Sequence, residues 1–191
     1  MIQMPFAVET YFDRESEKRI RALSDRCATL GGSAVIKETR PHISLGVADE
    51  VSHEKMEALL VSFARRHKPF EITLSAIGFF AVTPSIAYLS PKVDQSLLEL
   101  HAEFFGEFTE GASGIWEHYS PRSWIPHCTL AAGLDARQCA LVIEEVQRFV
   151  LPAACRITEI GVIRFRPVVP IRSFVLTGSP EAPSQTTDPT P

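Results

Sequence analysis

The sequence lacks the features that mark extracellular, membrane-bound or metal-dependent proteins. Its four cysteines form no C-x-x-C pair and no spacing typical of a zinc site. The first residues show no basic segment followed by an apolar run, which a signal peptide would have. No stretch approaches the roughly 18 consecutive apolar residues of a membrane span. These absences predict a cytoplasmic protein with free thiols, no metal, no cofactor and no membrane contact.

The sequence also lacks an excess of positive charge. Nineteen basic residues stand against 23 acidic ones, for a formal net charge of -4. Domains that coat nucleic acid are usually basic, so this balance argues against a long-RNA substrate. It still allows one nucleotide or one RNA 3' end to bind in a local positive pocket.

The length and the 45% hydrophobic content allow one sizeable core. We therefore expect a monomer in which residues 1–178 form a single domain of two lobes that are not independent. Residues 179–191 are rich in Pro, Ser and Thr and contain no large apolar residue. They are predicted to be a disordered tail.

The periodicity of apolar residues predicts the same order of elements twice: strand, helix, short strand, helix, strand. The helices are predicted to begin after Asp13, Ser52, Asp94 and Asp135, and residues 111–126 are expected to form a loop. The strands are expected at residues 6–12, 42–47, 70–80, 86–89, 127–131, 155–165 and 173–177. This duplication predicts an α+β fold of two lobes, each an antiparallel-rich sheet flanked by helices, with a cleft between them.

One five-residue pattern occurs at equivalent places in the two halves. Pro41-His42-Ile43-Ser44-Leu45 and Pro126-His127-Cys128-Thr129-Leu130 both read Pro-His-x-[Ser/Thr]-Leu. Residues i and i+2 of a strand point to the same face, so each motif presents an imidazole beside a hydroxyl.

Two such strands placed together would surround a phosphate diester. A neutral histidine could take a proton from the attacking oxygen while a protonated one gives a proton to the leaving oxygen. Histidine suits both roles because its ordinary pKa is roughly 6.5. The hydroxyls of Ser44 and Thr129 would bind the phosphate oxygens, so this chemistry needs no metal.

The competing interpretation is that the motif histidines are merely two buried residues at the ends of similar strands. A lone His-x-Ser pattern is weak evidence, because it also occurs by chance at His118-Tyr119-Ser120. That segment lacks the preceding Pro and the following Leu of the two motifs. His101 lies on an apolar helical stripe and is expected in the core.

Two further sets could shape the pocket. Arg40 and Arg122 lie near the motifs and are the preferred phosphate-binding arginines. The aromatic residues before the second motif are the best candidates for stacking a base: Trp116, Tyr119 and Trp124. Ordinary packing or surface roles remain open for each of them.

With both motifs, the sequence resembles the two-histidine (2H) phosphoesterase superfamily, which includes 2'-5' RNA ligases and 2',3'-cyclic phosphodiesterases. The resemblance implies that the protein opens 2',3'-cyclic phosphates of RNA ends or small nucleotides to 2'-phosphates, without a metal. The reverse reaction would be 2'-5' RNA ligation. The resemblance does not indicate which of the two histidines is the base. The alternative is a non-catalytic nucleotide or RNA-end binding module on the same scaffold.

Overall fold

The computed structural model describes residues 4–31, 39–149 and 151–179. Within these residues, eight strands form one antiparallel sheet in the order β5-β2-β1-β7-β3-β4-β6, and β8 pairs with β7. The strands are β1 (Phe6–Phe12), β2 (His42–Val51), β3 (Phe70–Phe80), β4 (Ser85–Pro91), β5 (Ala112–Ile115), β6 (Cys128–Leu134), β7 (Ala153–Arg164) and β8 (Val169–Val175). The α+β class is confirmed. The predicted tail, from residue 180 on, lies outside the described residues.

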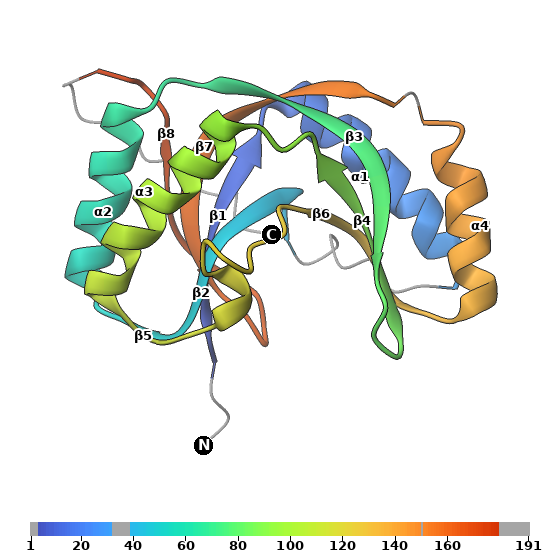
Figure 1. Cartoon of the computed structure of the whole chain (residues 1–191), viewed down its shortest axis with the longest axis horizontal. Helices are drawn as coiled ribbons and strands as arrows, with labels where there is room; N and C mark the ends of the chain where they lie inside the picture. Colours follow the sequence, from blue (N-terminus) through green and yellow to red (C-terminus); the bar gives the residue numbers. More distant parts are fainter. Residues whose placement is uncertain (1–3, 32–38, 150, 180–191) are drawn as a thin grey trace.

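Four α-helices flank the sheet in two pairs (Figure 1). They are α1 (Arg14–Thr29), α2 (His53–Arg66), α3 (Gln95–Gly111) and α4 (Ala136–Val146). In each, the predicted residue caps the N-terminus by accepting a backbone hydrogen bond: Asp13, Ser52, Asp94 and Asp135. Such a cap typically contributes about 1 kcal/mol to the stability of a helix. The local starts of all four helices were therefore readable from the sequence.

The two lobes do not coincide with the two halves of the sequence. Helix α1 packs on α4 and on β6, while α2 packs on α3, so each helix pair takes one member from each half. Figure 1 shows these pairs on opposite sides of the molecule. Strand β7, near the end of the chain, pairs with β1 on one side and with β3 on the other. The lobes therefore share one continuous sheet.

The segment 111–126, expected as a loop, contains strand β5 and a 3₁₀ helix at Glu117–Tyr119. Strand β5 pairs with the edge of β2, where Ala48 lies opposite Ile115. Its four residues carry no clear apolar alternation, so only this pairing defines it as a strand.

The motif strands alternate between core and cleft as predicted. The intervening residues Ile43, Leu45, Cys128 and Leu130 are all buried in the core. In a strand this leaves the histidines and hydroxyls of both motifs on the other face. Burial of these four side chains in the core thus determines which face of the sheet carries the motif histidines and hydroxyls. Among the described residues, no helix is long and apolar enough to cross a membrane.

Because Leu130 is fully buried, Leu130→Ala should lower the free energy of unfolding by about 2–5 kcal/mol, through lost burial and the cavity left behind. Urea denaturation measures this change. Leu98→Ala is the matched control, because Leu98 is 45% exposed on α3 and should lose far less. Equal losses in the two variants would contradict the assignment of Leu130 to the core.

Candidate active site

His127 immediately precedes β6 and is held by a backbone carbonyl. Its Nδ1 lies 2.6 Å from the carbonyl oxygen of Ile125. Since the carbonyl only accepts, Nδ1 carries a hydrogen and Nε2 is left for chemistry. The rings of Phe80 and Tyr88 meet the imidazole edge-on, at centroid distances of 4.9 and 5.5 Å.

This environment favours the neutral form of His127. Burial lowers its pKa, the hydrogen bond to the Ile125 carbonyl partly opposes that, and the charge of His42 lowers it further. Near neutral pH the bare Nε2 can therefore accept a proton.

His42, the first residue of β2, repeats this arrangement. Its Nδ1 lies 2.7 Å from the carbonyl oxygen of Arg40, again two residues earlier in the chain. In both motifs a proline separates the carbonyl from the ring and restricts the backbone there. Both imidazoles therefore have the same tautomer when neutral, with Nε2 as the reactive nitrogen.

The two motifs meet although β2 and β6 are not neighbours in the sheet order. Strands β2 and β6 contact each other, and a hydrogen bond links the Cys128 thiol to the backbone of His42. The two imidazoles are close enough for the charge of His42 to lower the pKa of His127. The structure thus brings both predicted histidines to one place.

The two motif hydroxyls have different surroundings. Ser44 is 8% exposed and its side chain hydrogen-bonds with Tyr119. Thr129 is half-buried and lies opposite Tyr88 in the pairing of β6 with β4. Ser44 is therefore engaged within the protein, whereas Thr129 is more accessible.

Glu9 is a site residue that sequence reasoning missed. Its Oε1 lies 3.3 Å from Nε2 of His42, and its side chain is 2% exposed. Burial raises the pKa of Glu9, while His42, a hydrogen bond with Tyr11, and Arg40 oppose that rise. The one signal in the sequence was a carboxylate inside the otherwise apolar first strand. Its place beside the motif follows from the β1–β2 register, which sets Glu9 opposite Ser44 and Tyr11 opposite His42.

Arg40 does not have the position expected of a phosphate-binding residue. Its guanidinium pairs with Glu159 at 3.0 Å and with Glu17 at 3.2 Å, and lies 4.4 Å from the centre of the Tyr11 ring. Two carboxylates thus already balance its charge, which favours a structural role at the start of β2 over the predicted phosphate contact. Arg122 is exposed in the turn after the 3₁₀ helix.

Trp124 does not have the position expected of a base-stacking residue. It is 8% exposed, and its ring stacks on His101 at 3.7 Å and 3°. Its Nε1 donates to the carbonyl of Ser44 at 3.0 Å. A base cannot reach a ring packed in this way, so Trp124 supports β2 from inside the core. His101 is a core residue as predicted, and burial lowers its pKa to about 4.

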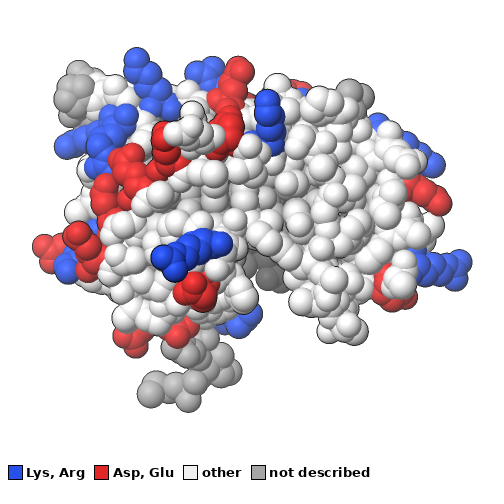
Figure 2. Space-filling model, viewed as in Figure 1, with Lys and Arg blue, Asp and Glu red and all other residues white. Residues whose placement is uncertain are grey.

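Trp116 and Tyr119 line a pocket of about 410 Å³ that also contains His127. One wall comes from the β3–β4 hairpin and the other from the segment before β6. The lining residues are Phe80, Val82, Ile86, Trp116, His118, Tyr119, Ser123, Ile125 and His127. Figure 2 shows a hollow between the two sides of the molecule whose surroundings are mostly uncharged.

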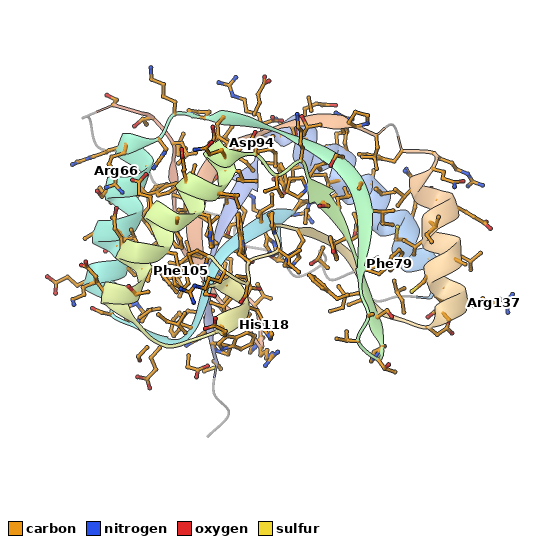
Figure 3. The ribbon with its side chains drawn as sticks, in the orientation of Figure 1. Arg66, Phe79, Asp94, Phe105, His118 and Arg137 are labelled. Atoms are coloured by element: carbon orange, nitrogen blue, oxygen red, sulfur yellow. The ribbon has the colours of Figure 1, made fainter. Side chains whose placement is uncertain are left out.

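His118, which the weak His-x-Ser pattern gave little reason to include, belongs to this pocket. Figure 3 shows it at the lower edge of the molecule, on the 3₁₀ helix that faces the β3–β4 hairpin. A pocket of about 510 Å³ elsewhere is lined mainly by β3 and α3 and contains neither motif histidine. We place the site beside the former pocket because its lining includes the motif histidine His127.

No group of three or more His, Cys, Asp or Glu side chains that could hold a metal ion occurs within residues 4–31, 39–149 and 151–179. The four cysteines are free thiols.

The fold and the paired motifs are those of the two-histidine phosphoesterase superfamily. The chain belongs to the 2'-5' RNA ligase superfamily, whose family model matches residues 12–167. No curated protein matches the sequence.

Solved structures share the fold. A protein described as a phosphoesterase has 20% identity and a TM-score of 0.59, covering 92% of this chain and 99% of its own. Escherichia coli LigT with 3'-AMP has 18% identity and a TM-score of 0.57, with the same coverage. The protein TT0787 of Thermus thermophilus has 16% identity and a TM-score of 0.58, covering 93% of this chain and 100% of its own. At these identities the similarity shows the fold alone.

Trp124→Phe should keep the stacking on His101 but leave the buried Ser44 carbonyl without its indole donor. We expect the free energy of unfolding to fall by about 1–3 kcal/mol, measured by urea denaturation. Trp116→Phe is the control, because its indole donates to Asp49 in a half-buried position that water can reach. A Trp124 variant as stable as the wild type would contradict the supporting role.

Proposed function

We propose that the protein is a metal-independent phosphodiesterase that opens 2',3'-cyclic phosphates to 2'-phosphates. One observation carries the proposal: His42 and His127 lie together, and each is held by Nδ1 so that Nε2 is the reactive atom. Acid–base catalysis of a phosphate diester needs two groups of this kind. The family supports a phosphoesterase or ligase, and the cyclic-phosphate substrate is our inference.

His127 is the general base in this proposal. Its neutral Nε2 accepts a proton from water as the water oxygen forms a bond to phosphorus. The P–O3' bond breaks, and the leaving O3' takes a proton from Nε2 of His42. The product keeps its phosphate on O2', and proton exchange with solvent resets both rings.

Hydroxyl groups complete the phosphate site. Thr129 donates to a non-bridging oxygen, where charge builds up in the transition state. The Ser44 hydroxyl is hydrogen-bonded to Tyr119, so in this proposal the two side chains bind the phosphate together. Arg122, exposed and near the second motif in the chain, is the remaining basic residue proposed for phosphate.

The pocket beside His127 favours a nucleotide as substrate. Its lining is largely apolar, and Trp116 and Tyr119 offer aromatic surfaces to a base. E. coli LigT has been solved with 3'-AMP and with ATP, which supports a nucleotide ligand here. The net charge of -4 favours a small nucleotide or a single RNA end over a long RNA.

The reverse reaction would use the same groups. A 2'-hydroxyl in place of water would attack the cyclic phosphate and give a 2'-5' linkage. A non-catalytic nucleotide or RNA-end binding module is the alternative, but binding alone does not require two imidazoles with the same reactive nitrogen.

His42→Ala and His127→Ala should each lower kcat by a factor of about 10²–10⁴ without unfolding the protein. Hydrolysis of 2',3'-cyclic AMP in EDTA, with circular dichroism on the same samples, measures both effects. His53→Ala is the matched control, since His53 begins α2 and lies outside the His127 pocket. Near-wild-type activity in either motif variant would remove its residue from the mechanism.

The acidic limb of the pH–rate profile should reflect His127. The base must be unprotonated, and its lowered pKa means that activity is lost only as the pH falls below the ordinary imidazole value of roughly 6.5. We therefore expect kcat/KM for 2',3'-cyclic AMP to be largely retained at about pH 6.5. An acidic limb clearly above that value would contradict His127 as the base.

The most informative assay compares 2',3'-cyclic nucleotides, RNA with a cyclic phosphate end and ADP-ribose 1'',2''-cyclic phosphate, all in EDTA. Product analysis should find 2'- rather than 3'-phosphates. Tight binding of 2'-AMP without turnover of any cyclic phosphate would favour the binding module instead.

A further inference from the structure

A buried carboxylate stands directly beside the reactive nitrogen of His42. Glu9 is 2% exposed and its Oε1 lies 3.3 Å from Nε2 of His42. Its second oxygen, Oε2, is buried and has no hydrogen-bond partner in the part of the chain that the structure describes. The Tyr11 side chain hydrogen-bonds with Glu9. A carboxyl group in this position affects whether Nε2 of His42 carries a proton.

An ionised Glu9 would be costly in a site that receives a phosphate. Burying a carboxylate without full pairing is unfavourable, and an anionic diester would be repelled by it. The titratable or charged groups that act on Glu9 and His42 come from every neighbouring element. They are Tyr11 on β1, Arg40 before β2, Tyr119 on the 3₁₀ helix, and His127 and Cys128 at β6.

These neighbours do not supply a second strong cation. Arg40 is already paired with Glu17 and Glu159, and the β7 residue opposite Glu9 is Gly161, which carries no side chain. His42 is therefore the partner that can neutralise Glu9.

We propose that Glu9 and His42 share a single proton across the Nε2–Oε1 contact, which makes Glu9 the positioning residue that keeps His42 the proton donor. Nδ1 of His42 keeps its hydrogen, because it donates to the Arg40 carbonyl. The proton between Nε2 and Oε1 is therefore the one that can move between the two groups. With it, the pair is either an imidazolium beside a carboxylate or an imidazole beside a carboxylic acid. Both forms are neutral overall, so neither repels a phosphate.

The pair also separates the roles of the two histidines. Nε2 of His42 is occupied by the shared proton and cannot act as a base. His127 instead contacts the rings of Phe80 and Tyr88, and neither residue is a carboxylic acid that could share a proton with its Nε2. This inference rests on the proposed function and adds to it a reason why two equal motifs act unequally.

The proton balance of the cycle is closed. The Nε2–H bond breaks as O3'–H forms, which leaves a bare imidazole and the Glu9 carboxylate. That buried negative charge lies beside a newly formed phosphate monoester, and their repulsion favours product release. The pair then regains its proton from water.

Glu9→Gln tests the pair, because it keeps the shape of the side chain and removes its ability to hold a proton. The basic limb of the kcat/KM profile for 2',3'-cyclic AMP reports loss of the shared proton. Without the carboxylate it should move to lower pH by about one unit or more, since an opposite charge at this distance stabilises the imidazolium. The loss of activity should be about tenfold greater at pH 8 than at pH 6, while the acidic limb stays in place.

A basic limb at the same pH in Glu9→Gln and the wild type would overturn the proposal. Glu159→Gln is the matched control: it removes another buried carboxylate, one that pairs with Arg40 instead of a motif histidine. Its basic limb should move far less. An equal shift in this control would show a general charge effect and would also count against the pair.

Tyr11→Phe provides a second variant if Glu9→Gln does not fold. The Tyr11 hydrogen bond lowers the pKa of Glu9, so its loss should strengthen the hold of the pair on its proton. The basic limb should then move to higher pH, opposite to Glu9→Gln. A shift to lower pH in Tyr11→Phe would contradict the shared proton.

Nitrogen-15 NMR of the His42 imidazole separates this inference from the proposed function, because it needs no substrate. At one fixed pH near neutrality, the Nε2 signal should shift toward that of an unprotonated nitrogen in Glu9→Gln relative to the wild type. If that shift occurs but no cyclic phosphate is turned over, the pair stands and the proposed function fails. If turnover occurs but neither the signal nor the basic limb moves, the pair is wrong and the proposed function stands.

Discussion

The close approach of β2 to β6 is the constraint on which the site depends. The two strands lie at different places in the sheet order, separated by β1, β7, β3 and β4. They meet because the sheet curves, with the α2–α3 pair against one side and the α1–α4 pair against the other (Figure 1). The Cys128 thiol and the backbone of His42 are joined at that meeting point. Flattening the sheet would separate the two imidazoles.

Within this frame, two nearly identical motifs are given different chemical environments. Each ring is held by a carbonyl two residues upstream, so the local geometry is the same. The difference comes from the strand alongside: β1 brings a carboxyl group to His42, whereas β3 and β4 bring the aromatic rings of Phe80 and Tyr88 to His127. Neighbouring strands thus give two similar motifs unlike surroundings, a carboxyl group at His42 and aromatic rings at His127.

What the sequence could predict was local. The motif strands, the caps of four helices and the alternation of Ile43 and Leu45 with the cleft-facing residues depend on a few adjacent positions. The motif pair also indicated the superfamily. The strands, the caps and the alternation follow from strand and helix signals, which the order of residues carries directly.

What it could not predict was set by distant contacts. Glu9 belongs to the site through strand register, and Trp124 is withdrawn from it by stacking on His101, a residue of α3. Arg40 pairs with two carboxylates, one from α1 and one from β7, which no spacing in the sequence indicated. Strand β5 exists only because the edge of β2 accepts it.

The central position of β7 has a consequence for the order in which the molecule can be assembled. This strand, residues Ala153–Arg164, is made after both motifs, yet it is the piece that joins β1 to β3. A nascent chain that already contains both motifs still lacks the strand that connects the two sides of the sheet. The two motifs can therefore be held together by a continuous sheet only after Ala153–Arg164 have been synthesised.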